Sequence, residues 1–268
     1  MKIGIVTGAS SGLGRESVIQ LWEHFGGMDA IWVVARRRER LLELSQQVGV
    51  PLCIFSLDLT KGRDLAVLAA ALAKEKPQVK FLVNAAGFGK TGPLAEMSME
   101  DSVGMVQLNC TALTAVTRMV LPYMAENSRI IQYASSAAFL PQPGFAVYAA
   151  TKAYVFSFSR ALNRELKDRR ICVTAVCPGP VRTEFFDRAG GTLPLYKRLV
   201  MANPRRVAAK AIRDSIACRE LSIYSPAMEL FYLLTKLIPH RLLLGALLAA
   251  QTRMRQKLPA ARTVTKED

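Results

Sequence analysis

A chain of 268 residues with 51% hydrophobic and 21% charged residues can bury a sizeable core, which excludes an intrinsically disordered protein. The formal net charge is +15, but the basic residues are scattered without an aromatic platform; this argues against nucleic acid as a partner and favours a solvated surface. Five cysteines and two histidines lack metal-ligand or C-x-x-C spacing, so we expect no metal site, reduced thiols and a cytoplasmic location.

Seven short apolar segments predict strands, and several are nearly continuous in apolar residues, as in strands covered on both faces. They are residues 3–7, 30–35, 52–57, 81–84, 129–134, 171–177 and 221–225. Longer segments of helical period lie between them, including 38–48, 64–76 and 148–167, and Asn203 before Pro204 predicts a helix start. The alternation predicts an α/β fold: one doubly wound parallel sheet of about seven strands flanked by helices. We expect a single domain, 1–268, with a core of 1–225 and a C-terminal helical appendage of 226–268.

The first predicted strand runs directly into T-G-A-S-S-G-L-G, which carries glycines at positions 8, 12 and 14 and leads into a helix. Glycines at this point allow a tight turn and let the backbone approach a pyrophosphate at the positive end of the helix. The same residues could form a purely structural turn, since the spacing is not G-x-G-x-x-G. Its place after a first parallel strand favours dinucleotide binding.

The second predicted strand ends in W-V-V-A-R-R-R, where a dinucleotide fold reads the adenosine ribose. An acidic side chain there would accept a hydrogen bond from the 2′-hydroxyl of NAD(H). Arg36 and Arg37 supply two guanidinium groups and no carboxylate, which suits a 2′-phosphate. The pattern therefore predicts NADP(H) in preference to NAD(H), although an ordinary cationic helix start would look the same.

An ordered set of motifs resembles the short-chain dehydrogenase/reductase family, of the compact single-domain type, over about residues 1–225. The motifs are T-G-A-S-S-G-L-G at 7–14, D-L at 58–59, N-A-A-G at 84–87, Asn109, Ser135, Y-A-A-T-K at 148–152 and P-G-P-V-R-T at 178–183. Each motif alone could be accidental, but the set in this order is specific. The resemblance implies a Rossmann fold and an oxidoreductase acting on C=O and CH–OH groups.

The resemblance also implies which residues hold the cofactor. Asp58 would bond the adenine amino group, and Thr183 would contact the nicotinamide carboxamide. Ala85 departs from the family, which often has a second asparagine there. The implied cofactor residues are Gly8, Ser10, Ser11, Gly12, Leu13, Gly14, Arg36, Arg37, Asp58, Leu59, Asn84, Ala85, Gly87, Tyr148, Lys152, Pro178, Gly179, Val181 and Thr183.

Four residues are implied to be catalytic. Asn109 would hold a water molecule in a proton relay, Ser135 would orient the substrate oxygen, and Tyr148 would be the general acid or base. Lys152, four residues after Tyr148, would also hold the nicotinamide ribose. An ammonium about 5 Å from the phenol stabilises the phenolate by roughly 3 kcal/mol at an effective dielectric near 20, or about two pKa units. We therefore expect Lys152 to lower the pKa of Tyr148 into the range of a working acid or base.

The sequence repeats the Y-x-x-x-K spacing at Tyr232 and Lys236, so the spacing alone is not diagnostic. Thirteen residues before Tyr148 stands Ser135, whereas Arg219 holds the equivalent place before Tyr232. We interpret the second pair as an amphipathic helix face whose lysine extends to solvent.

The segment 184–202 follows P-G-P-V-R-T and mixes aromatic residues with glycines, which predicts a mobile lid over a lipophilic substrate; a lid that only packs on the core would look alike. Its marked residues are Phe185, Phe186, Gly190, Gly191, Leu193 and Tyr196. The leading hypothesis is an NADP(H)-dependent carbonyl reductase or alcohol dehydrogenase for hydrophobic ketones, either steroid-like (hydroxysteroid-dehydrogenase-like) or acyl-chain. The alternative is a catalytically silent NADP(H)-binding sensor or scaffold, against which the intact Ser135, Tyr148 and Lys152 argue.

The C-terminal tail is apolar but is divided by Pro239 and by charged residues, so we expect it not to span a bilayer. Three interpretations remain, in decreasing order of preference: helices that close the substrate pocket, an oligomer interface, and a membrane-surface contact with a basic flank. His240 is interpreted as an interfacial or capping side chain. We expect a homodimer or homotetramer.

Overall fold

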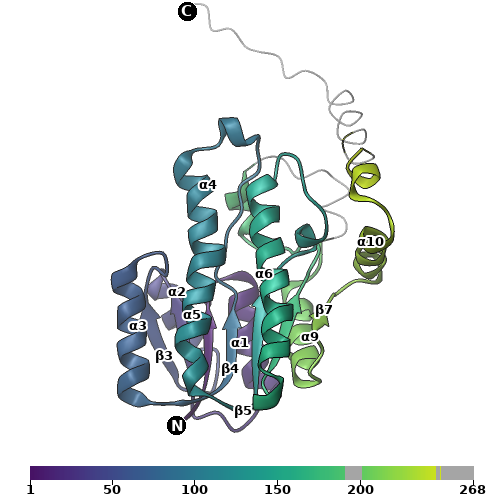
Figure 1. The fold of residues 1–268 in the computed structure, drawn as a ribbon. Coiled ribbons are helices and arrows are strands. Elements are labelled where there is room, and N and C mark those ends of the chain that lie inside the picture. Colours follow the sequence, from purple (N-terminus) through teal and green to yellow (C-terminus); the bar gives the residue numbers. More distant parts are fainter. Residues whose placement is uncertain (191–200, 246–247, 249–268) are drawn as a thin grey trace, which may run out of the picture.

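The computed structural model describes residues 1–190, 201–245 and 248. Its centre is one seven-stranded sheet in the order β3-β2-β1-β4-β5-β6-β7, and every neighbouring pair is parallel (Figure 1). The strands are β1 Lys2–Thr7, β2 Ala30–Ala35, β3 Leu52–Ser56, β4 Gln78–Asn84, β5 Met124–Tyr133, β6 Cys172–Val176 and β7 Leu221–Ser222. The seven predicted strands and the doubly wound α/β architecture are confirmed.

Helices cover both faces of the sheet. They are α1 Gly12–His24, α2 Arg38–Ser45, α3 Gly62–Glu75, α4 Met99–Val106, α5 Leu113–Val120, α6 Ala146–Glu165, α7 Phe185–Ala189, α9 Pro204–Ile216 and α10 Pro226–Leu237. A π-helical segment, η2 Gln107–Ala112, joins α4 to α5, and four short 3₁₀ segments are η1 Leu94–Glu96, η3 Leu121–Tyr123, η4 Ser136–Phe139 and η5 Lys167–Arg169. In Figure 1, α3, α5 and α6 lie in front of the sheet, and α1 and α9 lie behind it.

Alternate side chains of the central strand β1 belong to two separate apolar cores, one on each face of the sheet. Ile5 of β1 joins Leu68 of α3 in the core on one face. The next residue, Val6, joins Leu21 of α1 and Leu41 of α2 in the core on the other face. Because both faces of the sheet are buried, side chains on either face are mostly apolar, which explains the nearly continuous apolar runs in the sequence.

Three strands differ by three residues or more from their predictions, and the first of them, β4, begins at Gln78 and not at 81. β5 begins at Met124 and not at 129, because Met124 pairs with Val79 before a register shift that brings Arg129 opposite Phe81. β7 is only Leu221–Ser222, since the chain then leaves the sheet toward α10.

The predicted helix start at Asn203 is confirmed. Its side-chain oxygen accepts a hydrogen bond from the backbone N–H of Arg205 at 2.9 Å, and Pro204 occupies the first helical position. α9 then packs against α1 and against β5 and β6, so this cap fixes the last helix of the second face.

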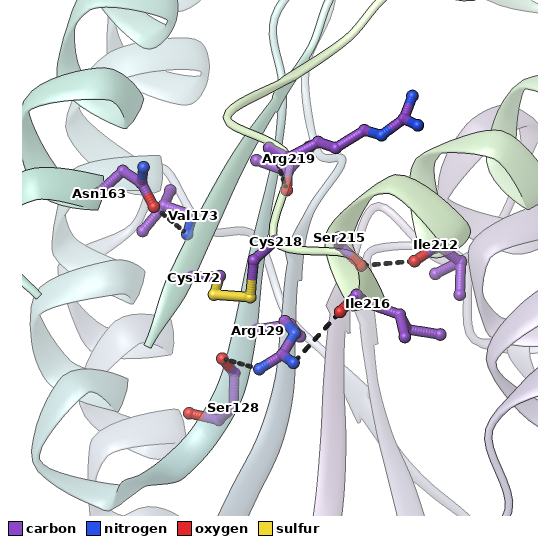
Figure 2. Close-up of a disulfide and its surroundings, with 11 residues drawn as sticks. Ser128, Arg129, Asn163, Cys172, Val173, Ile212, Ser215, Ile216, Cys218 and Arg219 are labelled. Carbon is purple, nitrogen blue, oxygen red and sulfur yellow. Dashed lines mark hydrogen bonds between the residues drawn. A yellow bond between two sulfur atoms is a disulfide. The ribbon is translucent and has the colours of Figure 1, made fainter. Parts of the chain in front are cut away.

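Cys172 and Cys218 form a disulfide, with their Cα atoms 5.3 Å apart (Figure 2). The expectation that all five cysteines are reduced thiols was wrong for this pair. The register of the sheet explains it: Ala175 pairs with Leu221, and three residues earlier the same register places Cys172 opposite Cys218. Their separation of 46 residues carries no spacing signal, so only the three-dimensional fold brings them together. The other three thiols, Cys53, Cys110 and Cys177, are free.

We expect reduction of this disulfide to lower the free energy of unfolding by about 2–4 kcal/mol, because a cross-link over a loop of this length restricts the unfolded chain. Urea denaturation of the wild-type protein with and without a thiol reductant measures the difference. A Cys172→Ser/Cys218→Ser double variant should match the reduced wild type and be insensitive to reductant. Equal midpoints for oxidised and reduced wild type would contradict the prediction.

Helix α10 follows the last strand and is apolar on two sides. Phe231 and Tyr232 pack against the core that contains Phe139, whereas Leu233 and Leu237 are exposed, Leu237 by 79%. Within the described residues, no helix is both long and apolar enough to cross a bilayer.

Candidate active site

A cleft of about 1300 Å³ opens at the carboxyl ends of the strands, above the point between β1 and β4 where the strand order reverses. Open parallel sheets bind ligands at such a point, because neighbouring loops diverge there. All of the site residues predicted from the sequence line this cleft except Asn84 and Asn109. Residues scattered from position 8 to position 183 therefore meet in one place.

The glycine-rich turn after β1 lies against the end of β4. Gly8 has a φ of +69°, and a Cβ atom there would come within 2.7 Å of the backbone nitrogen of Ala86. This close approach excludes any side chain and presses the turn onto the floor of the cleft.

The turn leads into the 13-residue helix α1, whose N-terminal end lines the cleft. The preceding residue, Ser11, makes no side-chain capping hydrogen bond to this helix, and the first turn contains no acidic residue. The first N–H groups and the positive end of the helix dipole thus remain available to an anion. A dinucleotide pyrophosphate fits this position.

The arginines after β2 line the adenosine side of the cleft. Arg37 donates hydrogen bonds to the hydroxyl of Ser10 at 3.2 and 3.3 Å and to that of Ser11 at 2.7 Å, and it pairs with Glu184 at 2.9 Å. Arg36 is exposed at the cleft edge. The Arg37 guanidinium therefore lies across the glycine-rich turn.

Asp58 follows β3 and also lines the cleft. Its Oδ1 accepts hydrogen bonds from the backbone N–H of Thr60 at 3.0 Å and from the Thr60 hydroxyl at 2.7 Å. Partial burial raises the pKa of Asp58, but these hydrogen bonds and the charges of Arg36 and Lys61 outweigh burial, so its pKa lies below the usual value. The side chain is therefore an ionised acceptor, which suits a partner that donates an N–H group.

Asn84 lies beneath the cleft floor and does not line it. It is 2% exposed, and its Nδ2 donates to the hydroxyl of Thr117 at 3.0 Å. Its Oδ1 finds no hydrogen-bond partner among the described residues. In this arrangement Asn84 supports the end of β4 from the core side, next to the cofactor residues rather than among them.

Asn109 is fully buried in the π-helical segment η2. Its Oδ1 accepts from the backbone N–H of Phe88 at 3.0 Å, and its Nδ2 donates to the carbonyl of Phe88 at 2.8 Å and to the hydroxyl of Thr151 at 3.0 Å. A π-helical turn widens the helix, and such turns frequently mark functional sites. Here Asn109 ties the loop after β4 to helix α6, which carries Tyr148.

Ser135, Tyr148 and Lys152 meet at the inner end of the cleft. Ser135 follows β5, and its side chain is hydrogen-bonded to the Tyr148 phenol. Tyr148 and Lys152 lie in α6, and each is 7% exposed. The Lys152 ammonium lies 5.7 Å from the centre of the Tyr148 ring and donates a hydrogen bond to the carbonyl of Tyr133 at 2.7 Å.

Burial dominates the pKa values of this pair. It raises the pKa of Tyr148 to about 12, an effect that the hydrogen bond with Ser135 only partly offsets. It lowers the pKa of Lys152 to about 8. Both shifts favour the neutral form, the opposite of what an ion pair produces. The expectation that Lys152 brings the pKa of Tyr148 below its ordinary value was therefore wrong: burial of the phenol dominates, and the pKa is raised.

The second Y-x-x-x-K pair provides an internal comparison. In α10, the Lys236 ammonium lies 5.6 Å from the centre of the Tyr232 ring, almost the same distance as in the first pair. Lys236 is nevertheless exposed, and Tyr232 packs against Phe139 with 4.9 Å between ring centres. Equal spacing thus gives two buried side chains in one helix and, in the other, a half-buried tyrosine with an exposed lysine. His240 lies nearby, its Nε2 3.3 Å from the carbonyl of Thr235 near the end of α10.

Aromatic side chains surround Tyr148. Phe145 stacks on its ring with 4.3 Å between centres, and Phe185 of α7 lies 5.2 Å away. Phe186, Met228 and Phe231 also line the cleft, so α10 closes its substrate side. Of the predicted lid, residues 184–190 and 201–202 are described; Gly191, Leu193 and Tyr196 lie outside the described residues.

Sequence reasoning missed two cleft residues, Phe145 and Glu184, and one residue that pairs with the cleft from outside its lining, Arg40. Phe145 precedes α6 and carried no motif, and Arg40 lay in a run interpreted as a solvated helix start. Glu184 was assigned to the lid without a role, yet it pairs with both Arg37 and Arg40. Glutamate directly after P-G-P-V-R-T was the available signal, but its arginine partners are more than 140 positions away in the sequence.

Within the part of the chain that the structure describes, no group of three or more His, Cys, Asp or Glu side chains could hold a metal ion. The donor set of the cleft instead consists of a helix N-terminus, backbone groups, hydroxyls and arginines. These groups fit a phosphate-bearing dinucleotide. Fold and cleft together define a dinucleotide-dependent oxidoreductase with a parallel sheet.

Comparison with known proteins agrees with this class. A family model described as short chain dehydrogenase matches residues 2–192. The chain is 36% identical over 187 residues to an NADP-dependent 3-hydroxy acid dehydrogenase of Shigella flexneri, an alignment that covers 68% of this chain and 74% of that protein. The chain belongs to the short-chain dehydrogenase/reductase family.

Solved structures of the same architecture extend over nearly the whole chain. A short-chain dehydrogenase from Sphingobium yanoikuyae in complex with NADPH superposes with a TM-score of 0.74 at 26% identity and 100% coverage of both chains. A bulky-bulky ketone specific alcohol dehydrogenase from Comamonas testosteroni gives a TM-score of 0.71 at 25% identity, with 97% and 96% of the two chains covered.

Proposed function

We propose that this oxidoreductase transfers a hydride between NADP(H) and a bulky, neutral, lipophilic ketone or secondary alcohol. The observation that carries the proposal is the Ser135–Tyr148–Lys152 set, in which Tyr148 and Lys152 are buried, at the junction of a dinucleotide cleft and an aromatic pocket. When bound, the nicotinamide would supply the hydride for carbonyl reduction.

The residues of the chain would handle the substrate oxygen and its proton. The phenol of Tyr148, with a pKa of about 12, is protonated at neutral pH and would donate its proton to the carbonyl oxygen as negative charge develops. Ser135, hydrogen-bonded to the phenol, would hold that oxygen in line. A protonated phenol is ready for carbonyl reduction, whereas alcohol oxidation first requires its deprotonation.

Lys152 and Asn109 would position the cofactor and the neighbouring loop and would not transfer protons. Lys152 is held by the carbonyl of Tyr133 and faces the floor of the cleft, where it would bind the ribose next to the nicotinamide. Gly87 lies between them: a Cβ atom there would come within 2.9 Å of the Asn109 Oδ1 and 3.5 Å of the Lys152 Nζ. The carboxamide of Asn109 would keep the loop after β4 against α6, and the water relay assigned to it by resemblance stays a prediction.

The pocket composition favours a neutral substrate over a hydroxy acid. Phe145, Phe185 and Phe231 line the cleft around Tyr148. Besides Lys152, Lys90 lines this side of the cleft, and it lies 3.6 Å from the carboxylate of Asp101, so its charge is already compensated. A substrate carboxylate would have to compete with Asp101 for it. A homo-oligomer in the cytoplasm remains the expected form of the enzyme.

A substrate screen tests the proposal. Neutral bulky ketones and 3-oxo acids are each offered with NADPH and with NADH, and nicotinamide oxidation is followed. We expect the highest kcat/KM for a neutral ketone with NADPH. A preference for 3-oxo acids would overturn the substrate class, and a preference for NADH would overturn the cofactor.

The cofactor assignment gives a separate prediction. Arg36→Asp should raise the Kd of NADPH about tenfold or more, because a charge-assisted contact to the 2′-phosphate is replaced by repulsion, while the Kd of NADH changes little. Arg38→Asp, at the start of α2 and outside the cleft lining, is the matched control for the change in charge. Isothermal calorimetry measures both; an unchanged ratio of the two affinities in Arg36→Asp would refute a role in cofactor choice.

A further inference from the structure

Glu184 sits where the cofactor-side arginines converge. Its Oε2 accepts a hydrogen bond from Arg37 at 2.9 Å, and its Oε1 accepts one from Arg40. Hydrogen bonds from Arg40 and Arg37 lower the pKa of Glu184, so the group is a carboxylate at neutral pH. Two guanidinium groups thus hold one anion at the rim of the cleft.

The same arginine also contacts the glycine-rich turn. While Arg37 Nη1 binds Glu184, its Nε and Nη2 bind the hydroxyls of Ser10 and Ser11. Arg37, Ser10, Ser11 and Glu184 all line the cleft. The Glu184 carboxylate therefore accepts a hydrogen bond from Arg37, one of the donors that a phosphate on the adenosine ribose would use.

Glu184 belongs to the lid and not to the adenosine side. It directly follows Thr183 and precedes α7, whose Phe185 lies 5.2 Å from the Tyr148 ring. The base of the lid is closed by pairing of Val181 with Ala202, and the far end of α7 is held through the Thr91 hydroxyl, which donates to the carbonyl of Gly190 at 2.6 Å. The ion pairs of Glu184 are thus the cofactor-side attachment of α7.

We propose that Glu184 is an internal competitor of the cofactor 2′-phosphate: its carboxylate and the phosphate bind the same guanidinium group, that of Arg37, so binding of a 2′-phosphate displaces Glu184 and detaches α7. Carboxylate and phosphate are both recognised by the forked guanidinium, and two anions cannot share the same donors without repulsion. A cofactor without the 2′-phosphate leaves Glu184 in place.

This inference rests on the proposed preference for NADP(H) and adds a consequence to it. The wild-type protein loses part of its intrinsic affinity for the 2′-phosphate to its own carboxylate. Binding of the 2′-phosphate is thereby coupled to the position of α7, the helix that holds Phe185 against Tyr148. Glu184 is accordingly a residue that sets cofactor specificity without taking part in proton or hydride transfer.

Binding of two adenosine fragments tests the competition without turnover. Isothermal calorimetry compares 2′,5′-ADP, which carries the 2′-phosphate, with 5′-AMP, which lacks it, on the wild type and on Glu184→Gln. We expect the variant to bind 2′,5′-ADP about fivefold more tightly, the size of effect that two exposed ion pairs support, with no change for 5′-AMP. Hydrogen exchange of α7 should rise on addition of 2′,5′-ADP to the wild type, but not on addition of 5′-AMP.

Glu220→Gln is the matched control, because Glu220 also bridges two arginines, Arg160 and Arg164, but does not line the cleft. It should bind both fragments as the wild type does. Unchanged or weaker binding of 2′,5′-ADP by Glu184→Gln would overturn the competition, the weaker result showing that Glu184 orients Arg37 for the phosphate. A wild type that binds 5′-AMP as tightly as 2′,5′-ADP would instead refute the proposed NADP(H) preference itself, so the two failures are distinguishable.

Discussion

Tyr148→Phe is expected to lower kcat/KM for ketone reduction about a thousandfold, since it removes the hydroxyl that donates the proton and keeps the ring. The phenyl ring can keep its stacking on Phe145 and its contact with Phe185, so the aromatic pocket is retained. Cofactor affinity should be unchanged, because the substitution leaves the glycine-rich turn, the arginines and Lys152 that line the cleft in place. Steady-state kinetics with NADPH and calorimetric titration of the cofactor measure the two quantities.

Tyr232→Phe is the matched control for this variant. The two tyrosines have a lysine at the same spacing and at nearly the same distance, 5.7 Å for Tyr148 and 5.6 Å for Tyr232. Because Tyr232 does not line the cleft, the control should retain wild-type kcat. If Tyr148→Phe retained wild-type turnover, or if both variants lost it equally, the assignment of the general acid to Tyr148 would be wrong.

The fold was predictable because its determinants are local. Buried parallel strands such as β2, which is buried at all six positions, must be apolar at every residue. Helix starts such as Asn203 carry their own capping signal. Strand ends without such a signal were not predictable: the first five residues of β5 are polar in part and join the sheet only through a register shift opposite β4.

The parts of the site that sequence could not supply depend on contacts between distant residues. The Cys172–Cys218 disulfide follows from the pairing of β6 with β7, and the Glu184 bridge follows from the lid folding back on the arginines after β2. Neither pairing leaves a periodic trace in the chain. The order of the motifs predicted which residues meet at the cleft, but it did not predict their ion pairs or their pKa shifts.

The pKa values of the buried pair show the same limit in energetic terms. The spacing of Tyr148 and Lys152 correctly predicted proximity on one face of α6. It could not predict the depth of burial, which disfavours both charged forms and reverses the direction of the shift for Tyr148. Burial of Lys152 has a consequence for stability that can be measured separately from catalysis.

Lys152→Met should become less stable relative to the wild type as pH rises, by about 2 kcal/mol between pH 7 and pH 9.5. The pKa of Lys152 is about 8 in the folded protein against 10.5 for an unperturbed lysine. Between these values the unfolded chain binds more protons than the folded one, so the free energy of unfolding of the wild type rises with pH. Methionine has no proton to lose, so the variant lacks this rise. Urea denaturation of both proteins across this range gives the difference, in which titrations common to both cancel.

Lys236→Met is the control, because its ammonium is exposed and folding does not desolvate it. Its stability relative to the wild type should be independent of pH over the same range. The pH range stops at 9.5 because unfolded tyrosines ionise near pH 10, whereas burial holds Tyr148 protonated to about 12. If the difference between wild type and Lys152→Met stayed constant with pH, the ammonium would keep its charge at no cost in the folded protein. The Tyr133 carbonyl, 2.7 Å from Nζ, would then compensate burial fully, and Lys152 would be a permanently charged group at the cleft floor.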